Sequence, residues 1–583
     1  MVGTMMTGCA NDDDTIEVPQ TENPNKTVTV TMTTTLSREG DDGATTRALD
    51  AAGHKTFAAD DQIAVIYKNT SNQTVKAVSS ALQDNGDITN SGKKAAFTVT
   101  LTDPAPDGAV RYIYPAAMAK ESVATSADVN SDDATVDFTN LEAQDGTLAT
   151  LATNYDLAVY DGTLTSDAAL PSGITLSNQL AILELTVKNA SGTPVNSSVT
   201  KLSVFDGTNV YKISRTTGNE PIYVALRPIT SDKTIHFCAT NGTTNYRKSV
   251  TGKTLERNNI YPVNLSTTET TGTALEFLTA NYTAQDGDIL SGILLGKYYI
   301  TTAQTTTDAA AITVTLDGVD INHNYTVTST GKPGIYCQGN TNLVLAAGSV
   351  NHVTACTTKY AAGIAIKSSR TLTISGSGSL TATGKGRDNG YGGAGIGGSH
   401  NDNAGNVVIT GGTITATGGY GAAGIGCGGN NNTHLLTCGN ISISGGTITA
   451  TGGIGGAGIG SGMIWPDNGD GDNKCGNITI TGGTITATGG SSGAGIGGGY
   501  SAGSEKKGHV ICGTITITSG VTRVTATKGS GSFNSIGEGK AGSGGTQNCG
   551  TITIGGTVYW EGSSYQNGGD TYLTTSPLTY PQQ

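Results

Sequence analysis

Apolar and polar residues alternate in short runs along most of this chain, and the pattern is sharpest between residues 405 and 554. Ile478 and Ile480 alternate with Thr479 and Thr481. Because successive side chains of a β-strand point to opposite faces, the isoleucines should face inward and the threonines outward. The same pattern recurs as GNVVITGG at 405–412, GNISISGG at 439–446, GNITITGG at 476–483 and GTITITSG at 513–520. Each block is therefore predicted to open one coil of a solenoid.

Three sets of residues repeat with the period of these coils, which is about 34 to 37 residues. They are the cysteines Cys438, Cys475, Cys512 and Cys549; the alanines Ala382, Ala416, Ala450, Ala487 and Ala526; and the Ala-Gly-Ile-Gly elements beginning at Ala394, Ala423, Ala457 and Ala494. Three short strands per coil predict a right-handed parallel β-helix in which equivalent residues stack at the strand spacing of about 4.8 Å. We place the cysteines in one of the rows just before a turn, stacked as buried thiols rather than joined as disulfides.

The first half of the chain has a different strand pattern, with separate alternating runs between clusters of turn residues. These runs are 27–36, 61–67, 96–101, 110–114, 157–160, 180–187, 202–205, 222–226 and 235–239. Such spacing is typical of β-sandwiches. The predicted fold class is therefore all-β. Its expected parts are a flexible tether over 1–25, sandwich subdomains over 26–155 and 156–265, and the β-helix over 266–583.

Composition narrows the function classes. The chain has 583 residues, of which 85 are glycine and 14% are charged, and its net charge is −13. Nucleic acid and anionic membrane surfaces are therefore not expected partners. No apolar run reaches the ~18 residues of a membrane-spanning helix, so any membrane attachment should be covalent.

The N-terminus carries a candidate attachment point. Met6-Thr7-Gly8-Cys9 resembles the lipobox of bacterial lipoproteins, and the acidic Asp12, Asp13 and Asp14 that follow resemble a surface-export signal. This resemblance implies a lipid on Cys9 and a place on the bacterial outer membrane or cell surface. The eight residues before Cys9 lack the apolar core of a signal peptide. The alternative is an ordinary flexible N-terminus.

Several motifs in the first half resemble the fimbrillin family, the subunits of type V pili. They are Thr46-Arg47-Ala48, the run from Phe57 to Tyr67, Arg111-Tyr112-Ile113-Tyr114-Pro115, the run from Asn178 to Leu185, and the run from Arg257 to Val263. The resemblance implies two sandwich subdomains, other pilus subunits as partners, and proteolytic processing after Arg47. The alternative for Arg47 is a solvated loop arginine. A β-helix after the sandwich departs from stalk subunits and favours a pilus tip or a stand-alone surface protein.

The β-helix blocks GGTITATGG and GAGIGGG resemble carbohydrate-binding β-helix modules of gut bacteria. Insertions cluster after each Ala-Gly-Ile-Gly element, and the variable edge of a repeat protein is commonly its binding face. Trp465 and Tyr500 lie in these insertions, while Tyr420 and Tyr391 precede two of the elements. These four residues are our candidate glycan contacts, because sugars stack on aromatic rings. The alternative is that they cover apolar coil ends.

One insertion offers oxygen ligands at alternate positions, in Asn468, Asp470 and Asp472. That spacing resembles the start of a calcium loop, although Asn473 replaces its glycine and no bidentate Glu follows. Calcium is therefore a tentative ligand beside the alternative of plain surface acidity. No other cofactor is expected.

The sequence indicates binding rather than catalysis. β-helix lyases and hydrolases need acidic groups, with or without calcium, beside a basic residue on a sheet face. Here the expected faces carry threonine, and Arg523 replaces a threonine without an acidic partner nearby. We expect a non-enzymatic surface adhesin that presents its β-helix to surface glycans or host proteins. The alternatives are a polysaccharide-active enzyme, an ice-binding surface built on the threonine rows, and a structural spacer.

Overall fold

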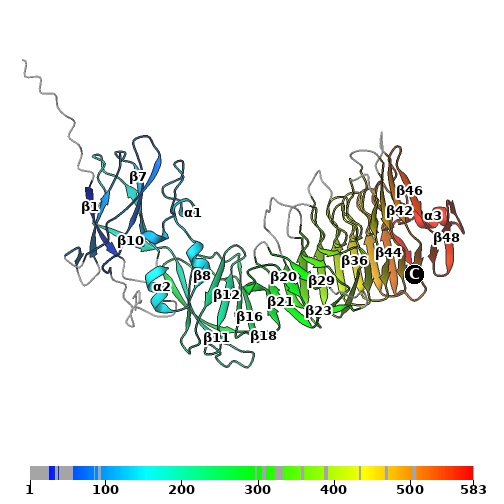
Figure 1. The fold of residues 1–583 in the computed structure, drawn as a ribbon, viewed down its shortest axis with the longest axis horizontal. Helices are drawn as coiled ribbons and strands as arrows, with labels where there is room; N and C mark the ends of the chain where they lie inside the picture. Colours follow the sequence, from blue (N-terminus) through cyan, green and yellow to red (C-terminus); the bar gives the residue numbers. More distant parts are fainter. Residues whose placement is uncertain are drawn as a thin grey trace, which may run out of the picture. The chain divides into compact units, whose positions relative to one another are not determined.

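The computed structural model describes residues 25–32, 37–38, 57–83, 86–89, 94–155, 157–171, 173–295, 298–304, 310–321, 332–355, 360–386, 392–431, 435–465, 470–501 and 507–581. The chain divides into two compact units. The first comprises Met1–Ala239 and Lys248–Thr268, and the second comprises Thr240–Arg247 and Glu269–Gln583. Figure 1 shows strands throughout both units and only short helices. Among the described residues, no helix has the length and apolar character needed to cross a membrane.

An eight-stranded sheet forms the first part of the first unit, in the order β4-β3-β7-β9-β10-β1-β6-β5. Its strands are β1 (Asn25–Met32), β3 (Ala64–Lys68), β4 (Thr74–Val78), β5 (Ile88–Thr89), β6 (Lys94–Thr100), β7 (Ala109–Tyr114), β9 (Ala158–Thr163) and β10 (Ile174–Asn178). β1 lies between β6, to which it is antiparallel, and β10, to which it is parallel. Tyr67, Phe97 and Tyr112 are fully buried in the core that this sheet encloses.

Two further sheets follow, in the orders β14-β11-β17-β2 and β18-β16-β15-β12-β13-β8. Their strands are β2 (Ser37–Arg38), β8 (Ala143–Gln144), β11 (Ala181–Lys188), β12 (Lys201–Phe205), β13 (Val210–Ser214), β14 (Ile222–Leu226), β15 (Thr234–Thr240), β16 (Thr244–Thr251), β17 (Asn259–Ser266) and β18 (Thr268–Thr271). The Gln144 side chain links the two sheets, because its amide donates to the carbonyl of Ala225 at 2.7 Å and accepts from the Ala225 N–H at 2.9 Å. Short helices α1 (Asp132–Thr135) and α2 (Leu148–Asn154) lie between these strands in the chain.

The path of the chain through these sheets interleaves the two expected subdomains. β9 and β10 come after residue 155 but pair within the first sheet, whereas β8 comes before it and pairs with β13. The short strand β2 likewise pairs with β17, far along the chain. A boundary drawn at residue 155 therefore separates strands of one sheet, since strand pairing here is not sequential.

The second unit is a solenoid of stacked coils, as the repeats predict. Its longest sheet has 19 strands. They are β19 (Thr273–Ala274), β21 (Asp288–Ile293), β23 (Ile312–Ile321), β25 (Thr341–Leu345), β26 (Val350–Thr354), β28 (Thr371–Gly376), β29 (Ser379–Thr383), β31 (Asn406–Ile409), β32 (Thr413–Thr417), β35 (Ile441–Ile443), β36 (Thr447–Thr451), β39 (Ile478–Ile480), β40 (Thr484–Thr488), β43 (Ile515–Ile517), β44 (Arg523–Thr527), β47 (Ile552–Ile554), β48 (Thr557–Glu561), β49 (Ser564–Tyr565) and β50 (Leu578–Tyr580).

Two smaller sheets complete the coils. A nine-stranded sheet contains β20 (Tyr282–Ala284), β22 (Ile300–Thr302), β24 (Ile335–Cys337), β27 (Ile364–Ile366), β30 (Ile396–Gly397), β33 (Ile425–Gly426), β37 (Ile459–Gly460), β41 (Ile496–Gly497) and β45 (Ile536–Gly537). A four-stranded sheet contains β34 (Leu436–Cys438), β38 (Gly471–Cys475), β42 (Gly508–Cys512) and β46 (Thr546–Cys549). Strands that succeed one another in these two sheets are parallel. The all-β fold class and the parallel β-helix are thus confirmed.

The predicted columns are in register. Ala416 pairs with Ala450 and Ala450 with Ala487, while Ile425 pairs with Ile459 and Ile459 with Ile496. Each of these side chains is fully buried. A column of identical small apolar groups thus forms the solenoid core, since neighbouring coils stand one strand spacing apart.

The glycine that ends each of the strands β30, β33, β37 and β41 of the nine-stranded sheet is required by this close stacking. Gly426 has φ of +132°, and a Cβ on it would stand 2.0 Å from the carbonyl oxygen of Gly460. Gly397, Gly460 and Gly497 have similar angles and similarly close contacts. A side chain at these positions would push adjacent coils apart.

The last coils are closed by antiparallel strands and aromatic residues. β48 turns back on β47, β50 turns back on β44, and α3 (Gly569–Thr574) lies between them in the chain. Trp560 is 8% exposed, and its indole donates to the carbonyl of Cys549 at 3.1 Å. These residues cover the end of the hydrophobic column.

The cysteine column requires a correction. Cys438, Cys475, Cys512 and Cys549 stack in register and are buried, as expected, although their row faces inward and not outward like the threonine rows. Cys438 is not a thiol, because it forms a disulfide with Cys427, which lies outside the periodic set. The other three are free and buried. The 37-residue interval could not reveal a partner only 11 residues away.

We expect the buried thiols to resist alkylation. The adjacent Cys512 thiol and burial raise the pKa of Cys475 well above its usual value, and burial raises the pKa of Cys337 to about 12. Since the thiolate is the reactive form, iodoacetamide at pH 8 should label these residues only after unfolding, as mass spectrometry of peptides would show. Native labelling of Cys475 at the rate of a free thiol would contradict this burial.

The same shift predicts how stability depends on pH. Above the ordinary thiol pKa of about 8.5 the unfolded chain loses thiol protons while the folded chain keeps them, so the free energy of unfolding should fall as pH rises. Urea titrations between pH 7 and 10 would measure this. Replacing Cys475 with Ala should flatten the dependence.

Arg111 explains part of the Arg-Tyr-Ile-Tyr-Pro motif. It is 3% exposed and makes paired hydrogen bonds with Asp161 at 2.6 and 2.8 Å. It also contacts Asp132 at 2.8 Å and donates to the carbonyl of Asn130 at 2.7 Å. Desolvation lowers the pKa of the guanidinium, but the two aspartates raise it more. One buried cation therefore ties β7, β9 and the segment around α1 together.

Replacing Arg111 with Ala should destabilise the first unit by ~3–5 kcal/mol, because the contacts with Asp132 and Asp161 would be lost and a buried space left. Arg227→Ala is the control, because Arg227 pairs with the exposed Asp133 and lies 4.3 Å from the centroid of the Phe138 ring, contacts that together should contribute less than about 2 kcal/mol. Urea unfolding monitored by circular dichroism would measure both. Equal effects of the two substitutions would contradict the buried network.

Gly426→Ala should destabilise the solenoid by roughly 3 kcal/mol or more, since it adds a backbone clash to an unfavourable φ. Gly544→Ala is the control, because Gly544 has φ of +81° but no atom within 4 Å of the position that a Cβ would occupy. Both tryptophans of the chain lie in the solenoid, so their fluorescence reports its unfolding in urea. Equal losses in the two variants would contradict the role of coil stacking.

Candidate functional site

The loops that follow the nine-stranded sheet lie along one edge of the solenoid. Their backbones form a hydrogen-bonded row in which Asn401 donates to Gly429 at 3.1 Å, Asn430 to Met463 at 2.9 Å and Ile464 to Tyr500 at 2.9 Å. Parallel bridges join Asn430 to Ile464 and Ile464 to Ser501. We call this row the loop edge. It holds successive loops at the strand spacing, so their side chains form one continuous surface.

Trp465 and Tyr500 meet on the loop edge although they come from successive coils. Their ring centroids are 6.4 Å apart and the ring planes are inclined by 58°. Trp465 is 50% exposed. The backbone N–H of Trp465 donates to the carbonyl of Asn430 at 2.8 Å. Trp465 is exposed and Tyr500 is half-buried, so the pair offers a stacking surface to a ligand mainly through the indole ring.

The candidate position of Tyr420 is occupied by an aromatic residue in one coil and by an aliphatic residue in the next. Tyr420 is half-buried, and the next coil has Ile454 at the equivalent place, 54% exposed. Gly421 donates to the carbonyl of Ile454, and Tyr500 donates to the carbonyl of Gly455. These backbone contacts bring the corner that contains Ile454 next to Tyr500. Tyr391 lies outside the described residues.

The candidate calcium ligands are only partly described. Asp470 accepts a hydrogen bond from the N–H of Lys507 at 2.9 Å, and Asp472 lies on β38 opposite His509. Asn468 lies outside the described residues. In the part of the chain described, no group of three or more His, Cys, Asp or Glu residues is placed to hold a metal ion. The calcium site stays a prediction, as do lipidation of Cys9 and cleavage after Arg47, which also fall outside the described residues.

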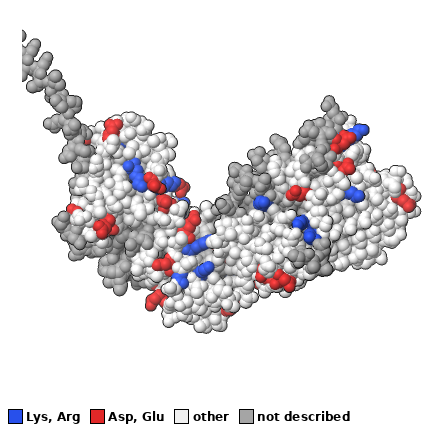
Figure 2. Space-filling view, in the orientation of Figure 1, with Lys and Arg blue, Asp and Glu red and all other residues white. Residues whose placement is uncertain are grey.

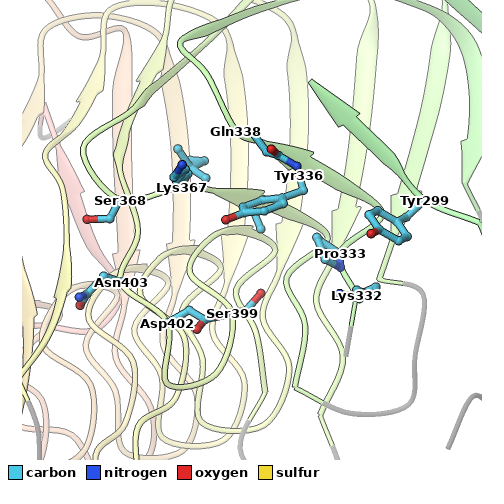
Figure 3. A pocket seen from close by; sticks show the side chains of 12 residues that line it. Tyr299, Lys332, Pro333, Tyr336, Gln338, Lys367, Ser368, Ser399, Asp402 and Asn403 are labelled. Atoms are coloured by element: carbon cyan, nitrogen blue, oxygen red, sulfur yellow. The ribbon is translucent and has the colours of Figure 1, made fainter. Parts of the chain in front are cut away.

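A cavity of about 450 Å³ lies in the earlier coils of the solenoid (Figure 3). Three successive strands of the nine-stranded sheet and the segments next to them supply most of its wall. The lining residues are Tyr299, Lys332, Pro333, Tyr336, Gln338, Ala365, Ile366, Lys367, Ser368, Ser399, Asp402 and Asn403. The last three belong to the loop that follows β30, where the loop edge begins.

The cavity exists because the size of the residues in the outward row of the nine-stranded sheet changes here. The row runs from Thr301 through Tyr336 and Ala365 to Gly397. Beyond Gly397 it consists of the closely stacked glycines, which leave no room for side chains. The Tyr336 ring therefore lies beside the smaller Ala365 side chain. The space on the outer side of Ala365 is left open.

The polar groups of the cavity surround this ring. In Figure 3, Lys367 and Gln338 lie on one side of Tyr336, and Ser399 and Asp402 lie on the other. Desolvation, followed by the nearby Asp402, raises the pKa of Tyr336, so its hydroxyl remains a neutral donor and acceptor. Burial raises the pKa of the Asp402 carboxyl, although this side chain keeps substantial contact with solvent.

Tyr299 supplies a second aromatic ring to the cavity lining. The ammonium group of Lys332 lies 5.6 Å from the centroid of that ring, within the range of a cation–π contact. The sequence patterns did not single out Tyr299, Tyr336 or Lys367, because these residues belong to coils in which the repeat is degenerate. Ser399, Asp402 and Asn403, in contrast, lie in one of the insertions predicted to form the variable edge.

Charge is sparse on the surface around these features. On the face shown in Figure 2, uncharged residues cover most of the described surface, and charged groups are scattered. Arg523 takes the place of Thr484 in its row, as expected, and is exposed. In the described residues it forms no ion pair within 4.0 Å.

The chain was compared with known proteins. The family model described as a β-helix repeat matches residues 372–400, 407–429, 441–463 and 478–500. No curated protein matches the chain. Several solved structures resemble part of it at low identity.

Among these is a candidate cell adhesion protein from Bacteroides fragilis, with 12% identity and a TM-score of 0.25, covering 42% of this chain and 96% of that one. A fimbrial protein from Bacteroides ovatus has 13% identity and a TM-score of 0.22, covering 42% of this chain and 50% of that one. A fimbrial assembly protein from Parabacteroides distasonis has 11% identity and a TM-score of 0.25, covering 41% and 90%. The family model thus matches the predicted β-helix repeat, and fimbrial and cell adhesion proteins, the class that the motifs of the first half resemble, are among the partly similar structures. At these identities and TM-scores the structural likenesses assign no function.

Proposed function

We propose that this chain is a cell-surface adhesin that binds a glycan along the loop edge of its solenoid. The observation that carries the proposal is the cavity beside Tyr336, which combines an accessible aromatic ring with amide, hydroxyl and charged groups. Sugars are recognised by such combinations, because their C–H faces pack on aromatic rings while their hydroxyls need donors and acceptors. The volume of about 450 Å³ is within the range of small-ligand sites.

The aromatic pair supports an extended ligand. Trp465 lies two coils beyond the loop that contains Asp402, which is roughly 10 Å at the strand spacing. A chain of sugars that occupies the cavity could therefore continue along the loop edge to Trp465 and Tyr500. Repeated coils favour such a ligand, since each adds a similar contact at a regular interval.

Binding without catalysis fits the cavity better than glycosidic bond hydrolysis. Glycoside hydrolases ordinarily place two carboxyl groups about 5 to 9.5 Å apart across the scissile bond. Among the described residues that line the cavity, Asp402 is the single carboxylate. The proposal therefore gives the cavity a recognition role.

The surface location rests on the sequence. The lipobox resemblance at Cys9 and the fimbrillin motifs between Thr46 and Val263 support an exported protein held by a lipid or incorporated in a pilus. Other pilus subunits would be partners of the first unit, and glycans or host proteins would be partners of the solenoid.

Binding of the full chain to a panel of plant and mucin polysaccharides tests the proposal. Tyr336→Ala, Trp465→Ala and Tyr500→Ala should each weaken binding roughly two- to tenfold, the range expected for one aromatic contact. Val350→Ala is the control, because this exposed apolar residue lies on β26 of the long sheet. Tryptophan fluorescence in urea would verify that each variant is folded. A panel without saturable binding, or equal binding by all variants, would contradict the proposal.

A further inference from the structure

We propose that the cavity selects a sugar that carries a carboxylate, and that Lys367 binds this carboxylate. The inference rests on the proposed glycan-binding function and names its ligand class. It starts from a local reversal of charge. The whole chain has a net charge of −13, whereas the cavity lining contains two lysines and one aspartate.

Both lysines are available to a ligand. The ion pairs among the described residues involve Arg111, Arg227 and Arg247, and none includes Lys332 or Lys367. Lys332 is exposed and lies over the Tyr299 ring. Lys367 is half-buried, so its ammonium group is partly desolvated and would gain more from an anionic ligand than a fully exposed lysine would.

The backbone of Lys367 is held in place from two sides. Its N–H donates to the carbonyl of Cys337 at 2.9 Å, and the residue forms an antiparallel bridge with Ala404. The first contact joins it to the strand that carries Tyr336, and the second joins it to the loop that carries Asp402. Lys367 is thus fixed at the cavity rim by the coils before and after it, which is how a specificity-determining group should be placed.

Tyr336 and Asp402 complete the recognition of such a ligand. The Tyr336 ring can pack against the sugar while its neutral hydroxyl bonds to ring substituents. In Figure 3, Asp402 lies on the side of Tyr336 away from Lys367. This arrangement orients a carboxylated sugar, because its anionic group is drawn toward Lys367 and repelled by Asp402, leaving its hydroxyls to Asp402 and Ser399.

Two natural sources supply a ring-bound carboxylate, namely uronic acids and sialic acids. Calorimetry with the full chain would distinguish them, using galacturonate oligosaccharides beside their carboxyl-reduced counterparts, and sialyllactose beside lactose. We expect the carboxylated member of at least one pair to bind roughly tenfold more tightly than its neutral partner, as a charge-assisted hydrogen bond would provide. The pair that shows this preference identifies the source.

The residue assignments are tested with matched variants. Lys367→Gln should lower affinity for the carboxylated ligand roughly tenfold and leave the neutral ligand within twofold. Asp402→Asn should raise affinity for the carboxylated ligand roughly two- to threefold, since it removes a repelling charge. Lys474→Gln, which removes an exposed lysine on β38, should change neither affinity.

The outcomes separate the inference from the function on which it rests. Neutral and carboxylated ligands that bind equally, or an unchanged preference in Lys367→Gln, would overturn the choice of a carboxylated sugar while leaving glycan binding in place. Absence of binding by every sugar, in the calorimetry and in the polysaccharide panel, would overturn the proposed function itself. A preference that is lost in Lys367→Gln and kept in Lys474→Gln would establish the inference.

Discussion

The solenoid depends on one constraint, which is that each coil must hydrogen-bond to the next at the strand spacing of about 4.8 Å. Equivalent residues of successive coils are then placed side by side. Only side chains that pack against a copy of themselves at this distance fit into the interior. Alanine and isoleucine fill the interior columns for this reason. At Gly426, where the backbone turns with a positive φ against the next coil, even a methyl group would collide with a carbonyl oxygen. The regular repeat in the sequence is therefore a consequence of the fixed spacing between coils.

The same constraint decides where a ligand can bind. In coils with the glycine row, the outer face of the nine-stranded sheet has no side chains to shape a pocket. The row admits a large residue only in the earlier, irregular coils, where Tyr336 stands beside Ala365. In the regular coils, the loops between strands carry the proposed ligand contacts Trp465 and Tyr500. The proposed ligand cavity and the closely stacked glycine row therefore lie in different coils of the solenoid.

This division explains how far the sequence could be interpreted. Strict periods predicted the solenoid and the registers of the alanine, isoleucine and cysteine columns, because equal spacing along the chain becomes contact in space. Cys427 has no counterpart in the other coils, so its bond to Cys438 was invisible to that reasoning. The cavity was missed for a related reason, since Tyr336, Lys367 and Asp402 come from coils of unequal length. Their proximity depends on stacking that no single motif encodes.

The first unit shows the complementary case. Its motifs predicted strands such as β7 and β11, but not their partners, because pairing there joins segments far apart in the chain. β1 lies between β6 and β10, and β2 pairs with β17. The buried Arg111 illustrates the consequence, since it joins Asp132 and Asp161, which are remote from it in sequence. In the solenoid each coil pairs with the next coil along the chain, at a nearly constant separation in sequence. In the first unit the fold depends on contacts between segments far apart in the chain. A short motif there indicates that its residues form a strand, but not which strands pair with it.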